Sequence, residues 1–126
     1  MTWRTLFWTA AIFNWLVGAP LLLSPEPLLG MLEVAAPADL TFHRMSGLLI
    51  VCLGAVYAFT AQELARYRPL IWIAVVGKLG VVGIFALAWA QGFTPARAFG
   101  LALGDLAFAL AFIVFLATYK VNRPAS

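Results

Sequence analysis

Lys78 and Asp105 are charged residues that interrupt two of the four long apolar runs in this sequence. Insertion scales put the cost of a charged side chain at the bilayer centre at about 2.5–3.5 kcal/mol, so such residues are usually paired and functional. Their opposite charges allow an ion pair, and a flexible lysine stem can cover the few ångströms between their expected depths. These two residues are therefore the first candidates for chemistry inside the chain.

Three other polar residues are expected near them. Asn14 lies half-way along the first apolar run, and Arg44 lies about two helical turns into the second. A cluster of Lys78, Asp105, Arg44 and Asn14 would hold two bases and one acid, which favours an anionic head group, a quinone-like carbonyl or a small anion. His43 precedes Arg44 but points about 100° away around a helix, which places it at the possible rim of such a cavity.

Three interpretations of this cluster are open. A structural ion pair, Lys78 or Arg44 with Asp105, would determine which helices are neighbours, and loss of one partner would leave a costly buried charge. A polar cavity open to the outer face would bind a ligand. A proton relay through Asp105 is the third interpretation, although one acid and one lysine are few groups for a pump.

Other kinds of site lack the residues they need. The sequence holds one histidine, His43, and one cysteine, Cys52, whereas haem and zinc sites normally require several strong ligands. Ser46 lies three residues from His43 without an evident orienting acid. We therefore expect no catalytic residue, no metal and no cofactor, and no nucleic-acid partner because the sequence has no Lys/Arg cluster.

The elements that position these residues are predicted to be helices in a single membrane domain. Of 126 residues, 64% are hydrophobic and only 10% are charged, whereas soluble domains are about 25% charged. Each bilayer crossing needs about 20 apolar residues, so the chain has room for four. We predict an all-α integral membrane bundle with transmembrane helices over residues 3–23, 38–61, 69–90 and 96–119, and an interfacial linker over residues 24–37.

The distribution of Lys and Arg predicts the orientation of this bundle. One side would hold both termini and the second connection, with Arg4, Arg66, Arg68, Lys120 and Arg123. The other side would hold Arg44 and Arg97 next to acidic residues. We therefore expect both termini in the cytoplasm and a multi-pass protein in the lipid bilayer of a bacterial cytoplasmic (inner) membrane.

Glycines at short spacing predict close helix packing, because small residues let helix backbones approach each other in lipid. They occur in the second, third and fourth predicted helices: Gly47, Gly54, Gly77, Gly80, Gly83, Gly100 and Gly104. Two kinds of partner are open for these faces. One is the other helices of the same bundle, and the other is a second copy of the chain or another membrane protein.

Short motifs give the chain a resemblance to a known type. They are FNWLVGAP at residues 13–20, Arg44-x-x-Gly47, Gly77-Lys78-Leu79-Gly80 and Gly104-Asp105-Leu106. With these motifs, nearly the whole chain resembles small bacterial four-helix membrane proteins of the broad DoxX-like type. The resemblance implies an accessory membrane subunit, and some members of that type are associated with quinone-linked oxidoreductases. It carries no catalytic residue across to this chain.

Two functional hypotheses follow from these observations. The first is a non-catalytic accessory or assembly subunit of a larger membrane complex, because the chain is small and lacks redox ligands. The alternative is a protein that binds or transports a lipid, a quinone or a small anion through the buried polar cluster. An enzyme acting alone ranks third, since it would need a reactive group that this chain does not show.

Overall fold

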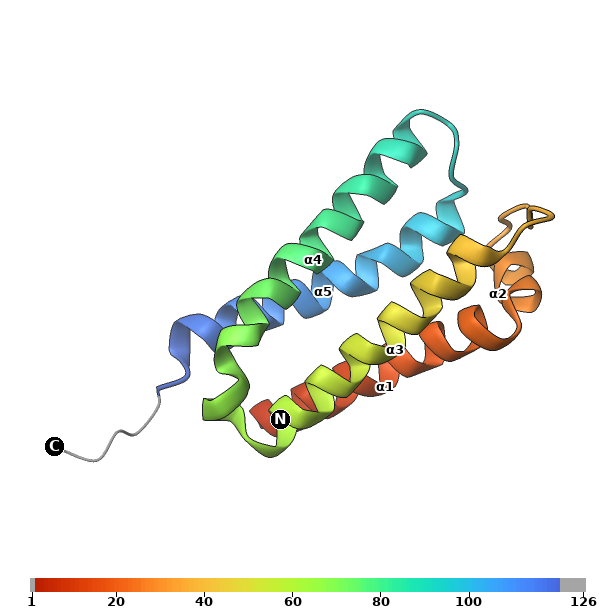
Figure 1. The fold of residues 1–126 in the computed structure, drawn as a ribbon. Helices are drawn as coiled ribbons and strands as arrows, with labels where there is room; N and C mark the ends of the chain where they lie inside the picture. Colours follow the sequence, from red (N-terminus) through yellow and green to blue (C-terminus); the bar gives the residue numbers. More distant parts are fainter. Residues whose placement is uncertain (1, 121–126) are drawn as a thin grey trace, which may run out of the picture.

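The computed structural model describes residues 2–120, and all regular secondary structure within them is helical. The five helices are α1 (Trp3–Leu23), α2 (Pro25–Met31), α3 (Thr41–Gln62), α4 (Leu64–Ala90) and α5 (Ala96–Thr118) (Figure 1). All except α2 are long and apolar enough to cross a bilayer. The predicted all-α architecture with four such helices is therefore confirmed. Arg123, which the orientation argument counted, lies outside the described residues.

The chain between α1 and α3 contains a short helix that was not predicted, and it extends further than the predicted linker. The predicted linker over residues 24–37 contains α2, a short helix that starts with a proline at its first turn. The next helix starts at Thr41 and not near residue 38. The reason is a turn at Asp39, whose Oδ1 accepts hydrogen bonds from the backbone N–H (2.9 Å) and hydroxyl (2.6 Å) of Thr41. Both hydrogen bonds lower the pKa of the Asp39 carboxyl, and the one from the Thr41 hydroxyl has the larger effect.

The connection between α3 and α4 is almost absent. The predicted helices left residues 62–68 as a connection, but Glu63 alone separates α3 from α4, with a φ of −139°. Pro69, which was expected to open the helix, lies inside α4 in its second turn. A proline there removes one backbone hydrogen bond. Arg68 donates from Nη2 to the carbonyl of Leu116 in the last turn of α5, where a cation is favoured by the helix dipole.

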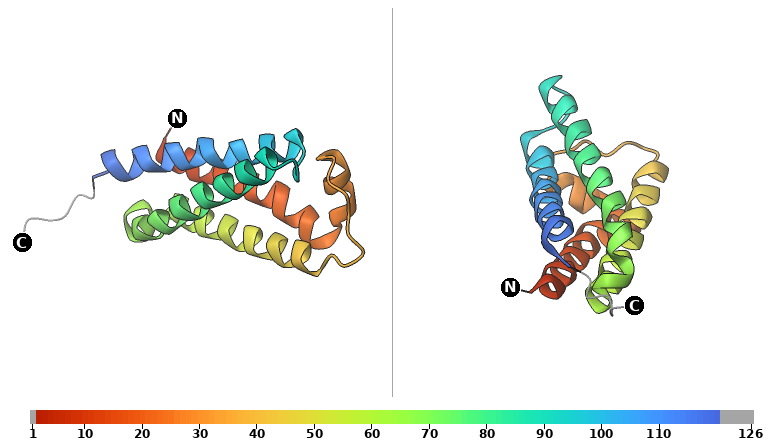
Figure 2. Two further views of the ribbon diagram at one scale, coloured as in Figure 1. Left: turned by 90° about the horizontal axis from the view of Figure 1, so that it is seen from above. Right: turned by 90° about the vertical axis from the view of Figure 1, so that its left-hand side faces the viewer.

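The helices pair into two hairpins. Helix α1 packs against α3 along its length, and α4 packs against α5, whereas contacts between these pairs are far fewer. The two pairs diverge from the end that holds Glu63 toward the end that holds α2, as the left-hand view of Figure 2 shows. We call these the Glu63 end and the α2 end. The interior of the molecule therefore differs between its two ends.

Aromatic side chains fill the Glu63 end. Phe7 stacks on Phe112 with ring centroids 4.9 Å apart and meets Phe115 edge-on at 4.9 Å. Tyr57 on α3 lies 5.2 Å from the Phe112 ring. All four side chains are almost fully buried, together with Ile71 of α4. Because this cluster draws on α1, α3, α4 and α5, it is where the two hairpins are joined.

Glycine determines how closely α1 and α3 approach. A Cβ added to Gly47 would lie 2.5 Å from the backbone nitrogen of Leu22, and one added to Gly18 would lie 2.9 Å from the carbonyl oxygen of Gly47. Real Cβ atoms do not tolerate such contacts with backbone, so the two helices need glycine where they cross. Gly54 and Gly104 are close to side chains, with added Cβ atoms 2.6 Å from Trp15 Nε1 and 3.0 Å from Phe13 Cζ.

The other predicted packing glycines do not contact a neighbouring helix. A Cβ added to any of these four would meet no atom of the described residues within 4 Å: Gly77, Gly80, Gly83 and Gly100. The interpretation of these glycines as packing positions within the bundle is therefore wrong. The physical reason is that these glycines lie on faces of α4 and α5 that no other helix of the described residues covers.

The outer surface is apolar. Leu16 on α1, Phe42 on α3, and Val76 and Ile84 on α4 are 69–71% exposed. These side chains are not buried in the protein, so burial does not explain why the four long helices are apolar. A lipid environment explains it, because the bilayer is the solvent in which these side chains are stable. The length and surface of the helices fit a multi-pass membrane protein.

Candidate functional site

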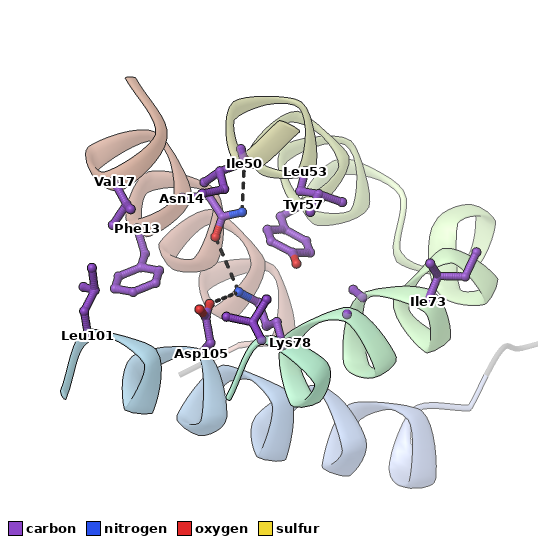
Figure 3. Close-up of a pocket in the computed structure, with 13 residues that line it drawn as sticks. Phe13, Asn14, Val17, Ile50, Leu53, Tyr57, Ile73, Lys78, Leu101 and Asp105 are labelled. Carbon is purple, nitrogen blue, oxygen red and sulfur yellow. Dashed lines mark hydrogen bonds and ion pairs between the residues drawn. The ribbon is translucent and has the colours of Figure 1, made fainter. Parts of the chain in front are cut away.

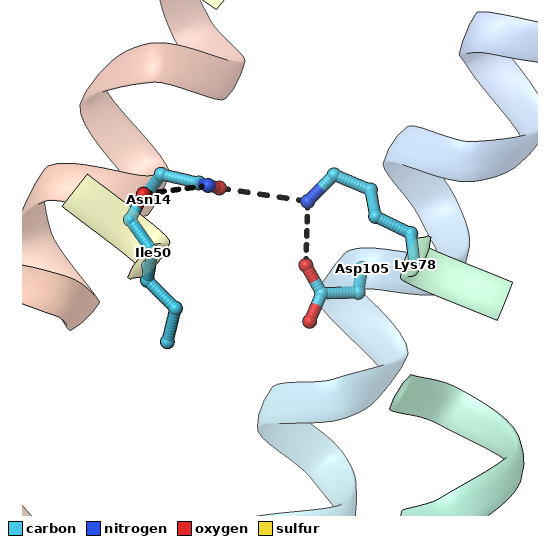
Figure 4. A network of polar contacts seen from close by, with 4 residues as sticks. All are labelled: Asn14, Ile50, Lys78 and Asp105. Carbon is cyan, nitrogen blue, oxygen red and sulfur yellow. Dashed lines mark hydrogen bonds and ion pairs between the residues drawn. The ribbon is translucent and has the colours of Figure 1, made fainter. Parts of the chain in front are cut away.

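Lys78 of α4 and Asp105 of α5 form an ion pair inside the bundle. Lys78 Nζ lies 2.6 Å from Asp105 Oδ1. The same ammonium donates a longer hydrogen bond of 3.5 Å to Asn14 Oδ1 of α1. The amide nitrogen of Asn14 in turn donates to the carbonyl of Ile50 on α3 at 3.2 Å. One polar network therefore joins all four long helices (Figure 4).

Each residue of this network occupies a middle position of its helix. Lys78 is near the centre of α4 (Leu64–Ala90), and Asp105 is near the centre of α5 (Ala96–Thr118). Lys78 and Asn14 are buried, with exposed fractions of 6% and 4%. The Asp105 side chain is 23% exposed. The carboxylate is thus the group of the network that is most open to its surroundings.

Three aromatic rings lie near the Lys78 ammonium, which also lines a cavity described below. Nζ lies 5.3 Å from the ring centroid of Tyr57, 5.6 Å from that of Phe108 and 5.9 Å from that of Phe13. A cation within about 6 Å of a ring face is attracted by the negative face of the ring. The rings thus partly replace the hydration that a buried ammonium loses. Sequence analysis missed these three residues because aromatic residues are common on helices that face lipid.

Arg44 does not belong to this network, and this corrects the predicted cluster. Since α3 starts at Thr41, Arg44 lies in the first turn and not two turns deep. Its exposed guanidinium donates from Nη1 to the carbonyls of Leu22 and Leu23, at 3.0 and 3.3 Å, where α1 ends. The network therefore contains one base and one acid, and its formal charge is balanced and not positive.

A cavity of about 260 Å³ opens beside the ion pair. Its polar wall is formed by Asn14, Lys78 and Asp105, and its apolar wall includes Phe13, Tyr57 and Leu53. Figure 3 shows these side chains arranged around the space between the helices. Several wall residues are also on the outer surface: Leu53 of α3 is 41% exposed, and Ile73 and Val81 of α4 are 68% and 38% exposed. The cavity therefore opens sideways between α3 and α4.

A larger chamber of about 590 Å³ continues from this cavity toward the α2 end. The two spaces share five lining residues: Val17, Ile50, Leu53, Val81 and Asp105. The chamber is walled mainly by apolar side chains of the long helices, α2 and the loop before α5, and His43 lies on its wall, where it was expected at a rim. Together the spaces form one cleft between the hairpins, apolar along most of its length and polar at its inner end.

An exposed ion pair connects α5 to the segment after α2, which lines this chamber. Arg97 of α5 pairs through Nε with Glu33 Oε1 at 3.2 Å and donates from Nη1 to the carbonyl of Met31 at 3.3 Å. Glu33 has a φ of +60°, in the left-handed region where glycine is usual after a helix. A glutamate there is strained by about 1–2 kcal/mol, and its carboxylate reaches Arg97 from that position. Sequence analysis gave Glu33 no role, because no sequence signal marked its backbone conformation.

Comparison with known proteins identifies no family for this chain. No protein-family model, no curated protein and no solved structure matches this chain. The ion pair, the aromatic rings and the cleft are therefore the observations from which a function can be derived.

We expect Lys78 and Asp105 to be energetically coupled. Either Lys78→Met or Asp105→Asn alone should lower the free energy of unfolding by about 3 kcal/mol, because each leaves a buried charge without its partner. The double variant should recover most of that loss, since a neutral pair removes both charges. Reversible unfolding in mixed micelles, read by circular dichroism, measures all four proteins. Strictly additive losses in the double variant would show that the two charges do not interact.

Proposed function

We propose that this protein binds an amphiphilic molecule from the bilayer in the cleft between its two hairpins. The observation that carries the proposal is the shape of the cleft. The cleft consists of two adjoining spaces that share five lining residues: the larger has mostly apolar walls, and the smaller reaches the Lys78, Asp105 and Asn14 side chains. An apolar pocket with a few convergent polar groups is typical of a small-molecule site. An amphiphile has the matching distribution of polarity.

The sideways opening supports entry from lipid. Leu53, Ile73 and Val81 border the opening and belong to the outer surface of α3 and α4. A molecule dissolved in the bilayer meets this surface directly and does not need to cross water. On the aqueous side, the segment after α2 lines the larger chamber with Leu32 and Val34.

We also propose that the four long helices span a bacterial cytoplasmic membrane with both termini inside. The support is the distribution of basic residues: Arg4, Arg66 and Arg68 belong to the Glu63 end, which then faces the cytoplasm. The α2 end, with its acids, then faces outward. Labelling of single cysteines placed at Arg4 and Pro37 with a membrane-impermeant maleimide in whole cells tests this orientation, in a Cys52→Ser background.

Filling the cleft should abolish ligand retention without unfolding the protein. Val81→Trp projects a large ring into the space that both parts of the cleft share. We expect the purified variant to retain at least fivefold less amphiphile per mole of protein than the wild type. Mass spectrometry of organic extracts measures the retained molecules after purification in mild detergent.

Val76→Trp is the matched control. Val76 lies on the same helix and is 71% exposed, so a tryptophan there points outward. This variant should retain as much amphiphile as the wild type. Equal retention by the Val81 and Val76 variants would contradict binding in the cleft.

A second candidate function is the accessory or assembly subunit to which the DoxX-like resemblance points. One observation favours it: the open face of Gly80 and Gly83 on α4, where an added Cβ meets no described atom. Small residues on a helix face allow another membrane helix to approach closely. A second copy of the chain or a different membrane protein would provide that helix.

Opposite effects of two alanine substitutions test this candidate. Gly80→Ala should leave the isolated protein unchanged or slightly more stable, since alanine favours helix by up to about 1 kcal/mol, and should weaken binding of a partner. Gly47→Ala should destabilise the isolated protein by about 1–3 kcal/mol through its clash with Leu22. Thermal unfolding and chemical cross-linking in native membranes measure the two effects. Absence of any cross-linked partner for the wild type would contradict a subunit role.

A further inference from the structure

We infer that the head group of the bound amphiphile is an uncharged hydroxyl, so that the ligand class is a long-chain alcohol. This inference rests on the proposed binding function, and it narrows the lipid, quinone and small-anion alternatives to one chemistry. Three independent features of the cleft carry it. They are the charge balance of the inner end, the composition of the walls, and the hydrogen-bonding groups that the network leaves unused.

The inner end is charge-balanced. Lys78 and Asp105 already neutralise each other at 2.6 Å, and Arg44 is engaged at the end of α1. An anionic head group would gain attraction from Lys78 but meet repulsion from the Asp105 carboxylate, which is the more exposed partner. A cationic head group would be attracted by Asp105 but repelled by Lys78. An uncharged head group is not repelled by either member of the pair.

The walls add a cost for charged ligands. The larger chamber has few polar side chains on its wall before Asp105 is reached: His43, Ser46 and Thr94. These lie toward the α2 end, whereas Lys78 and Asp105 are at the middle of their helices. Moving a bare charge to the middle of a bilayer costs several kcal/mol on any scale. A hydroxyl costs far less, because it can form hydrogen bonds when it arrives.

The network leaves both a donor and an acceptor for such a group. The Lys78 ammonium has three N–H donors, and two are directed to Asp105 and Asn14. Asp105 uses Oδ1 for the ion pair, and its partly exposed carboxylate lines both parts of the cleft. A hydroxyl can accept from the ammonium and donate to the carboxylate at once. A head group with a carbonyl alone can only accept, and it leaves the carboxylate without a donor.

The cleft also gives the alcohol a place for its chain. The segment of α5 between Pro95 and Asp105 lines the larger chamber at Ala98 and Ala102, and ten helical residues rise roughly 15 Å. Small alanine side chains on this wall leave room that Leu49 and Phe85 border from the opposite helices. A chain running from the ion pair to the α2 end would thus lie against mostly apolar side chains.

Three probes with one tail separate the head groups. Hexadecanol, hexadecyl sulfate and hexadecylammonium share their chain and differ in charge at neutral pH. The full-length protein in lipid nanodiscs is equilibrated with equimolar mixtures of the three, and native mass spectrometry counts the bound molecules. We expect hexadecanol to occupy the protein at least tenfold more than either ion, with empty nanodiscs as the reference for partition into lipid.

Charge variants should change this order in opposite directions. Asp105→Asn leaves Lys78 unopposed and should move the preference to hexadecyl sulfate. Lys78→Met leaves Asp105 unopposed and should move it to hexadecylammonium. The double variant restores neutrality and keeps the fold testable if a single variant fails to fold. It should still prefer hexadecanol to either ion, because its inner end is uncharged, but it should bind hexadecanol several-fold more weakly than the wild type.

Each contrary outcome has one meaning. If an ionic probe binds the wild type as well as hexadecanol or better, and Val81→Trp removes that binding, the alcohol inference is overturned while the proposed cleft function stands. Unchanged binding of hexadecanol by the double variant also overturns it, because the ion pair would then form no hydrogen bond with the hydroxyl. If none of the three probes exceeds its partition into empty nanodiscs, the proposed function itself fails.

Discussion

The ion pair between Lys78 and Asp105 constrains the rest of the structure. Two opposite charges in a low-dielectric interior must stay together, since separation leaves each without solvent or partner. Their contact at 2.6 Å keeps the centres of α4 and α5 adjacent. The hydrogen bond from Lys78 to Asn14 extends the same constraint to α1, and the hydrogen bond from Asn14 to Ile50 extends it to α3. The polar network thus connects the four long helices to one another near the middle of the bundle.

The packing of the helices differs on the two sides of this polar network. At the Glu63 end the rings of Phe7, Phe112 and Phe115 interlock, and the hairpins are held close. At the α2 end the glycine contact of Gly18 with Gly47 closes only the α1 and α3 pair. Within residues 2–120 nothing equivalent joins that pair to α4, and the cleft is the result. A bundle packed uniformly by side chains would have no such space, so the cleft follows from where the aromatic and glycine residues were placed.

Much of this architecture could be predicted from the sequence. Apolar runs of membrane length predicted the four long helices, and the bounds of α1 coincide with the predicted residues 3–23. Opposite charges at similar depth brought Lys78 and Asp105 forward as possible partners. Arg44 was misplaced because its depth depended on the start of α3, and a single turn at Asp39 moved that start. Helix boundaries depend on such local hydrogen bonds, which hydropathy does not reveal.

The rest of the site could not have been read from the sequence. The role of Tyr57, Phe13 and Phe108 around the ammonium depends on which helix faces are turned toward each other. Glycines in lipid-facing helices have the same appearance whether a helix covers them or not, and Gly47 and Gly80 differ only in what lies beyond them. The cleft itself is a consequence of divergence between hairpins, a tertiary property with no local signature.

Photo-crosslinking with hexadecanol that carries a diazirine midway along its chain tests binding in the cleft directly. The protein is irradiated in nanodiscs, and mass spectrometry of peptides locates the adducts. Binding in the cleft predicts adducts concentrated on its walls, at Leu53 and Val81, that excess hexadecanol removes. Adducts spread over the lipid-facing residues Val76 and Ile84, insensitive to competition, would contradict a binding cleft in this protein.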